Sequence, residues 1–234
     1  MIENHGEEAA GQPAEWPVDT QLILPCRDEA PALRGLLPRV PAGVRVIVVD
    51  NNSTDATAAV GRAHGAQVVS EPRPGYGAAV HAGLLAATAP IVVVMDGDGS
   101  FDPAVVPGLA DLVRRGDVDL ALGRRRPTAA GIWPWHARVG TALALSRLRR
   151  RTGLDLHDLA PVRAAHREAL LALGIEDRQM GYPLELLDRA GRAGWTVREV
   201  DVDYLPRAAG TRSKVSGSVR GSLRAAYDFW QVLS

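Results

Sequence analysis

The 234-residue chain has one cysteine, few aromatic side chains and no long apolar run. The single cysteine, Cys26, excludes an internal disulfide and indicates a reducing compartment, so we expect a cytoplasmic protein. We interpret Cys26 as a small core residue rather than a nucleophile. No segment approaches the ~18 consecutive apolar residues of a membrane-spanning helix, and the acidic, polar start differs from a signal peptide. The sequence therefore predicts a globular domain that does not span a membrane.

The chain also lacks net charge, with 27 basic and 27 acidic residues, which together with the few aromatic residues disfavours nucleic-acid binding. The charges are unevenly placed. Residues 1–18 are acidic and polar, and we expect them to form a disordered tail. Residues 124–151 contain eight arginines and no acid, and residues 204–227 contain five basic residues and no acid. Either segment alone could be a solvated surface, but two of them in a neutral protein favour an anionic ligand.

Apolar runs alternate with helical segments along the first half of the chain. The runs predict five strands, at residues 21–24, 44–49, 67–70, 91–95 and 118–122. Strands and helices that alternate at this spacing form a parallel α/β sheet, which binds its ligands at the carboxyl ends of the strands. The second half is less regular: we predict helices at 139–148, 162–173, 184–193 and 222–233, and a half-exposed strand at 196–204.

The most informative stretch is IVVVMDGDGSFD, residues 91–102. Its apolar run predicts a buried strand, and Asp96 and Asp98 follow directly at the carboxyl end. Two carboxylates one residue apart suit a hard divalent cation that also takes oxygens from a phosphate. The stretch therefore predicts a metal–diphosphate site.

The same stretch is compatible with other types of site, which differ in what they require of its residues. An EF-hand loop requires glycine at its sixth position, where this chain has Phe101, so we reject it. A phosphohydrolase with an aspartyl nucleophile also has a D-x-D-G-S pattern, with Asp96 attacking phosphorus. A solvated Asp-Gly turn is the non-functional alternative. A dinucleotide-binding fold is disfavoured, because no G-x-G-x-x-G motif follows the first strand.

Six segments occur in a characteristic order: LPCRDEAPAL, VVDNNSTDAT, GYGAAVHAGL, VVMDGDGSFDP, LALGRRRP and a final stretch from GYPLELLDRA to GTRSKVSGS. The ordered set resembles the inverting glycosyltransferases of GT-A fold, and within them the polyprenyl-phosphate sugar synthases related to dolichyl-phosphate mannosyltransferase. The R-x-x-G-x-x-S-K pattern from Arg207 to Lys214 narrows the resemblance to the lipid-phosphate branch. The resemblance implies one domain over residues 19–234, a Rossmann-like, mostly parallel sheet flanked by helices. Residues 19–125 would bind a nucleotide sugar, and 126–234 would form a smaller acceptor-side extension of helices and strands.

The resemblance also implies a role for each matching position. The base and ribose of a UDP- or GDP-linked sugar would contact Pro25, Arg27, Glu29, Asp50 and Asn51. Arg73 and the turn at Gly75 and Gly77 would close over the nucleotide. Asp96 and Asp98, with Ser100 as a further ligand, would hold Mg²⁺ or Mn²⁺ on the donor diphosphate. The cations expected near the donor diphosphate and the acceptor phosphate are Arg124, Arg138, Arg207 and Lys214.

The expected reaction moves a sugar from a nucleotide-diphosphate sugar to a polyprenyl phosphate. The departing nucleotide must have its negative charge neutralised, by the metal and by preorganised cations. A hydroxyl acceptor would also require a general base, for which Glu185 is the candidate, whereas a phosphate acceptor is already ionised. The many arginines favour the phosphate acceptor, and a hydroxyl on a sugar or small metabolite is the alternative.

A polyprenyl phosphate acceptor would bring the protein to the inner face of the cell membrane. Trp133, Pro134 and Trp135, beside the arginines, or the terminal helix would then lie at the lipid headgroups. The alternative is that these tryptophans belong to the core or to contacts with a second copy or a membrane-protein partner.

Overall fold

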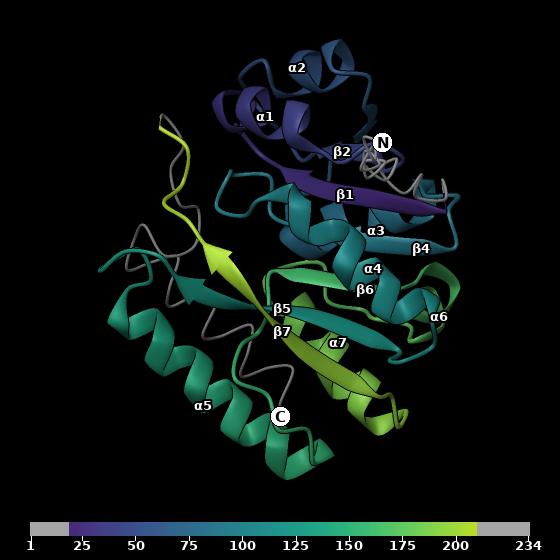
Figure 1. Cartoon of the computed structure of the whole chain (residues 1–234), viewed down its shortest axis with the longest axis vertical. Coiled ribbons are helices and arrows are strands. Elements are labelled where there is room, and N and C mark those ends of the chain that lie inside the picture. Colours follow the sequence, from purple (N-terminus) through teal and green to yellow (C-terminus); the bar gives the residue numbers. More distant parts are fainter. Residues whose placement is uncertain (1–18, 210–234) are drawn as a thin grey trace, which may run out of the picture.

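A seven-stranded sheet runs through residues 19–209, the part of the chain that the computed structural model describes (Figure 1). Its strands are β1 (Thr20–Cys26), β2 (Arg45–Asp50), β3 (Gln67–Ser70), β4 (Ile91–Val94), β5 (Leu120–Pro127), β6 (Val162–His166) and β7 (Val197–Tyr204). The strand order is β3-β2-β1-β4-β6-β5-β7. All neighbouring strands are parallel except β6, which is antiparallel to β4 and β5. The carboxyl ends of all strands except β6 therefore lie at one edge.

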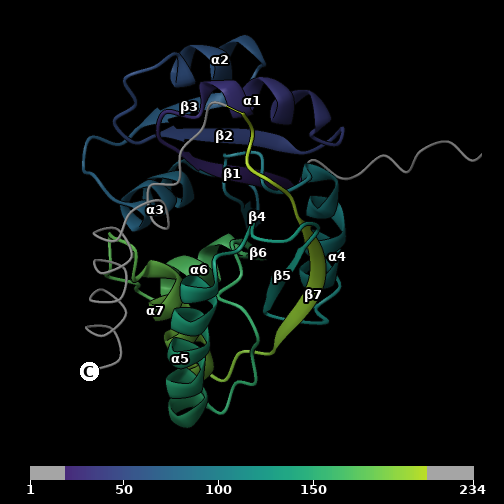
Figure 2. The same ribbon diagram turned by 90° about the vertical axis from the view of Figure 1, so that its left-hand side faces the viewer.

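Helices cover both faces of the sheet (Figure 2). The core on one face includes side chains from α1 (Ala30–Leu36), α2 (Thr57–Ala63) and α4 (Val106–Arg114). The core on the other face includes α3 (Tyr76–Ala86), α5 (Trp135–Thr152), α6 (Arg167–Ala172) and α7 (Tyr182–Arg192). Two short 3-10 turns, η1 (Leu37–Arg39) and η2 (Pro103–Val105), flank α1 and α4. No helix within residues 19–209 is long and apolar enough to cross a bilayer.

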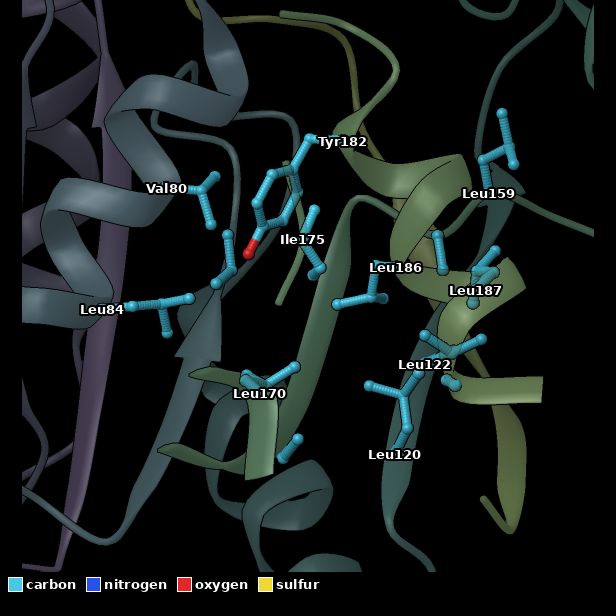
Figure 3. Close-up of a cluster of buried hydrophobic side chains, with 14 of the residues drawn as sticks. Val80, Leu84, Leu120, Leu122, Leu159, Leu170, Ile175, Tyr182, Leu186 and Leu187 are labelled. Atoms are coloured by element: carbon cyan, nitrogen blue, oxygen red, sulfur yellow. The ribbon is translucent and has the colours of Figure 1, made fainter. Parts of the chain in front are cut away.

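The core beneath α7 ties the two halves of the chain together. Tyr182, 1% exposed, lies between Val80 of α3 and Ile175, and Leu186 and Leu187 continue the cluster toward β5 (Figure 3). Segments of the second half of the chain therefore share one hydrophobic core with the first half.

Most of the predicted elements are confirmed, among them the strand at 67–70 and the helix at 184–193. Cys26 is buried and free, and burial raises the pKa of its thiol, as expected for a core residue. The disordered tail predicted at 1–18 and the helix predicted at 222–233 lie outside the described residues.

The predicted helix at 162–173 is wrong in its first half, where the chain forms β6 and only then α6. The sequence VRAAH has good local helix propensity, but here it hydrogen-bonds to strands on both sides, and four of its five residues are buried. Ser53 and Thr54 are the residue types that commonly cap a helix, and the sequence predicts one of them as the N-cap of the helix after β2. This prediction is wrong, because α2 begins at Thr57 and neither residue caps it.

Two glycines in helices offer a test of how closely α3 packs on the sheet. A β-carbon at Gly83 would collide with Cγ2 of Ile23 and come within 3.1 Å of Val49, whereas one at Gly108 of α4 would meet nothing within 4 Å. Gly83→Ala should lower the free energy of unfolding by about 1–3 kcal/mol through overpacking. Gly108→Ala should raise it by about 0.5–1 kcal/mol through helix propensity. Urea denaturation would measure both, and equal effects would contradict the close approach.

Candidate functional site

Asp98 is held in a defined orientation at the carboxyl edge of the sheet. Its Oδ1 accepts hydrogen bonds from the amide (2.9 Å) and the hydroxyl (2.5 Å) of Ser100. Gly99, at φ 79°, supplies the left-handed backbone conformation of this turn, which glycine adopts readily. Asp98 is also only 4% exposed. Burial and the hydrogen bonds from Ser100 together fix the orientation of its carboxylate.

The chain that leaves β7 returns over this turn. The amides of Leu205 and Ala208 donate to the carbonyls of Ser100 (2.9 Å) and Asp98 (3.1 Å). Arg207, between them, forms an ion pair from Nη1 to Asp98 Oδ2 at 2.8 Å. Both carboxylate oxygens of Asp98 are thus engaged, one by Ser100 and the other by a cation.

Asp96 lies next to the partly buried Tyr76 and the buried Arg163. The Tyr76 hydroxyl is hydrogen-bonded to Asp96 and accepts from Arg163 Nη1 at 3.2 Å. Burial, reinforced by the charge of Asp98, raises the pKa of Asp96 to about 6, although Arg163, Arg207 and Arg125 oppose the shift. Two carboxylates that repel each other in a buried place favour a bound cation.

Arg125 is a preorganised cation at the same edge. Asp158, fully buried, accepts from Arg125 Nε at 2.9 Å and from Nη2 at 2.5 Å. The guanidinium also stacks 4.1 Å from the ring centre of Trp133 and 5.7 Å from that of Tyr204. A guanidinium held on several sides keeps its position when an anion binds.

Arg124 does not face this site, contrary to the role that the family resemblance implied. It pairs with Asp201 of β7 at 2.6 Å, as Arg126 does at 2.7 Å, and these hydrogen bonds lower the pKa of Asp201 to about 2. The physical reason is strand alternation: β5 continues through Pro127, so Arg124 and Arg126 share one face and Arg125 lies on the other.

The side chain of Asn51 fixes the conformation of the loop after β3 through three hydrogen bonds. Its Nδ2 donates to the carbonyls of Glu71 (2.9 Å) and Arg73 (2.7 Å), and its Oδ1 accepts from the amide of Gly75 (2.9 Å). An aspartate could not donate the first two bonds. Asn51, 6% exposed, therefore positions the loop through its side chain.

Gly75 and Gly77 are required by a close backbone approach. A β-carbon at Gly75 would collide with the carbonyl of Arg178, and one at Gly77 would lie 2.5 Å from the carbonyl of Asp177. The amide of Gly77 also donates to the carbonyl of Gln179 at 3.0 Å. The segment 176–179 thus packs against the start of α3, which gives these glycines a structural reason independent of the nucleotide.

Glu185 braces the same segment from α7. Its Oε1 accepts from the amide of Glu176 (2.9 Å) and from Arg189 Nε (2.6 Å), and its Oε2 accepts from the amide of Asp177 (2.6 Å). Glu185 is 9% exposed. A carboxylate committed to two backbone amides and an arginine is a structural group, so the geometry does not support Glu185 as a general base.

The remaining predicted residues occupy the rim or lie outside the described chain. Pro25 is the last residue but one of β1, and Asp50 ends β2 opposite Cys26. Glu29 is buried ahead of α1, and Arg27 and Arg73 are exposed. Arg138 is exposed on α5, 6.0 Å from the ring centre of Trp133. Lys214 lies outside residues 19–209.

The donor set for a cation is small. Within residues 19–209 there is no cluster of three or more His, Cys, Asp or Glu side chains with metal-binding geometry. Ser100, 1% exposed, directs its hydroxyl to Asp98. Asp96 and Asp98 alone would suit a Mg²⁺-like ion that takes its other oxygens from phosphates and water.

Sequence reasoning missed four residues of the site: Arg125, Tyr76, Asp158 and Arg163. Strand alternation over LGRRRP would have distinguished Arg125 from its neighbours, had β5 been predicted at its full length. Arg163 was missed because residues 162–173 were predicted to be helical, whereas Arg163 lies in β6. Nothing in the sequence alone pairs Asp158 with Arg125.

Comparison with known proteins identifies the class. The family model of glycosyl transferase family 2 matches residues 21–174. The chain is 59% identical to an uncharacterized glycosyltransferase of Mycobacterium tuberculosis, over 91% of this chain and 97% of the relative. It is 31% identical to the polyprenol monophosphomannose synthase of Mycolicibacterium smegmatis, over 91% and 88% of the two chains. The dolichyl-phosphate hexose transferase of Haloferax volcanii is 30% identical, over 83% and 86%.

Solved structures give the same fold. Glucosyl-3-phosphoglycerate synthase of Mycobacterium tuberculosis, in complex with Mg²⁺ and UDP, matches with a TM-score of 0.70 and 25% identity, over 95% of this chain and 83% of that one. Its complex with Mn²⁺, UDP and glucosyl-3-phosphoglycerate matches with a TM-score of 0.68 and 26% identity, over the same shares. The architecture is that of a GT-A glycosyltransferase. The chain belongs to glycosyl transferase family 2.

The bracing role of Glu185 leads to a stability prediction. Glu185→Gln leaves one backbone amide of the 176–179 segment without an acceptor and removes the ion pair with Arg189. We expect the free energy of unfolding to fall by about 1–3 kcal/mol, as measured by urea denaturation. Glu168→Gln, at an exposed position in the first turn of α6, should change it by less than about 0.5 kcal/mol. Unchanged stability together with lost turnover would instead identify Glu185 as the base.

Proposed function

We propose that the protein transfers a sugar from a UDP- or GDP-linked donor to a polyprenyl phosphate, with inversion at the sugar carbon. The observation that carries the proposal is one sheet edge where Asp96 and Asp98 meet three arginines, Arg125, Arg163 and Arg207. Such an edge suits a reaction in which a diphosphate departs and a second phosphate attacks, because both carry charge that must be neutralised.

A divalent cation fits the donor set. Asp96 and Asp98 would hold Mg²⁺ or Mn²⁺, the ions in the structures of the related synthase. Burial and the charge of Asp98 raise the pKa of Asp96, and a bound cation would stabilise its ionised form. When bound, the ion would neutralise the diphosphate and make the nucleotide a better leaving group. Ser100 would orient Asp98 rather than bind the ion.

The side chains of the protein divide the remaining work. Tyr76, whose pKa burial raises to about 12, stays protonated and holds Asp96 in place. Arg125, fixed by Asp158, offers its charge to a phosphate without having to reorganise. With a cation held by Asp98, the guanidinium of Arg207, which pairs with Asp98 in the structure, would be available to the phosphates. Together these side chains would hold the donor diphosphate and the acceptor phosphate in position and place positive charge next to both.

Two observations support a phosphate as the acceptor. The first is the absence of an available base at Glu185, because a phosphate needs no proton removed. The second is the resemblance over most of the chain to a polyprenol monophosphomannose synthase and a dolichyl-phosphate hexose transferase. An acceptor of this kind would bring the protein to the surface of a membrane.

A second candidate acceptor is a small phosphorylated metabolite that reacts through a hydroxyl. The observation in its favour is the close fold match to glucosyl-3-phosphoglycerate synthase. The same arginines would then bind the phosphate of the metabolite, and a base other than Glu185 would be needed.

Donor binding is tested by thermal unfolding with UDP, GDP and their sugars, each with and without Mn²⁺. A ligand that binds only the native state raises Tm, so one nucleotide should do so in a metal-dependent way. Asp98→Asn should abolish the metal-dependent part. The matched control is Asp102→Asn in the same loop, where asparagine still caps the Ala104 amide, and it should behave as wild type. No shift with any nucleotide would refute the proposal.

The acceptor is identified by offering a water-soluble short-chain polyprenyl phosphate and 3-phosphoglycerate in parallel, with the preferred donor, and by mass analysis of the products. A glycosyl phosphate on the prenyl chain supports the proposal. Transfer to phosphoglycerate alone establishes the second candidate.

The ion pair at Asp98 gives a separate prediction. Arg207→Gln frees Oδ2 of Asp98, so Mn²⁺ alone should bind about fivefold more tightly, as expected if about 1 kcal/mol of ion pairing is no longer displaced. Turnover should fall by about 10²-fold, because a cation is lost from the phosphates. Electron paramagnetic resonance of Mn²⁺ measures the first effect. Arg126→Gln, on the outer face of β5, is the control and should change neither quantity.

A further inference from the structure

Helix α5 exposes a row of large apolar side chains. Trp135 is 75% exposed, Val139 49% and Leu143 68%, and they follow one another at four-residue spacing, so they lie on the same side of the helix. They are three of the five large hydrophobic side chains exposed within residues 19–209. The opposite side of α5 is buried through Thr141, Ala144, Leu145 and Leu148. Figures 1 and 2 both show α5 along the outside of the molecule.

The same face is basic. Helix α5 contains arginines at 138, 147, 149, 150 and 151 and no acidic residue. Arg147 and Arg150 are exposed beside the row and form no ion pair with an acid among residues 19–209, whereas Arg149 and Arg151 pair with Asp155 and Asp188. The apolar row thus leads, toward the end of the helix, into unpaired positive charge.

We propose that this face of α5 docks on the surface of an anionic lipid bilayer. Apolar side chains that enter the headgroup region, with flanking arginines on anionic lipid, are the physical requirements for a helix that lies in the interface. A symmetric contact with a second copy fits less well, because it would need acidic partners for Arg147 and Arg150 on the same helix face. None is present there.

The position of α5 links this surface to the candidate site. Trp133, just before the helix, stacks on Arg125. A groove of about 430 Å³ lies at the N-terminal end of α5, lined by Trp133, Trp135, Arg138, Val139, Thr141, Ala142 and His157. A bilayer docked along α5 would therefore meet this groove close to Arg125, on which Trp133 stacks. This inference rests on the proposed function, because only a lipid-linked acceptor makes use of the arrangement.

The test measures the partition of the full chain onto vesicles that contain 30% anionic lipid or none. Wild type should bind the anionic vesicles, and less strongly at high salt. Leu143→Glu should weaken binding by at least about tenfold, because it removes a leucine side chain that would be buried in the bilayer and adds a charge that anionic lipid repels. Its matched control is Leu85→Glu on α3, which is 60% exposed and away from the docking face, and which should bind as wild type.

A second pair of variants tests the charge. Arg147→Gln with Arg150→Gln should weaken binding by about 25-fold, since each arginine near an anionic surface contributes about fivefold. The control is Arg45→Gln with Arg62→Gln, two exposed arginines on β2 and α2. Thermal unfolding of each variant checks that it folds as wild type does.

The outcomes separate this inference from the proposed function. Turnover of a water-soluble short-chain prenyl phosphate should be unchanged in Leu143→Glu, while turnover of a long-chain acceptor in vesicles should fall. Lack of binding to anionic vesicles, or equal loss in Leu143→Glu and Leu85→Glu, would overturn the docking surface, as would a wild-type dimer that Leu143→Glu dissociates. Vesicle binding that depends on Leu143, without turnover of any prenyl phosphate, would retain the surface and refute the proposed acceptor.

Discussion

The reversed strand β6 is the constraint on which the site depends. Because it is antiparallel to both neighbours, it separates β4 from β5 and leaves their carboxyl ends at the same edge. The acids that follow β4 are thereby placed opposite arginines from β5 and from the exit of β7. The strand also contributes Arg163, a buried cation that reaches Tyr76. The antiparallel orientation of β6 thus places Asp96 and Asp98 close to the arginines of the site.

The loops around the start of α3 are held together by contacts between loops rather than by regular structure. Asn51 fixes the loop after β3, and the segment 176–179 closes on the start of α3, where only glycine leaves room. Glu185 in turn holds that segment from α7. A side chain that looks like a catalytic group in the sequence is here part of a brace that joins the two halves of the chain.

The sequence predicts the position of Asp96 and Asp98 after a buried strand, because they follow an unbroken apolar run that can only be a buried strand or helix segment. It also predicts the shared edge, since the alternation of strands and helices determines the direction of β1 to β5. It fails at β6, where pairing with two neighbouring strands outweighs local helix propensity. It fails again at Arg124 and Arg125, where one residue of strand register decides which arginine faces the site. The partners of Glu185 and Asp158 depend on tertiary contacts that no local pattern encodes.

The ion pair between Arg207 and Asp98 would couple the binding of the two proposed substrates energetically. Oδ1 of Asp98 accepts hydrogen bonds from Ser100, so a divalent cation and Arg207 would compete for Oδ2. An anion that draws Arg207 away therefore raises the affinity for the cation, and by linkage the cation raises the affinity for that anion by the same factor. Donor and acceptor phosphates would then bind with positive cooperativity through a single carboxylate oxygen.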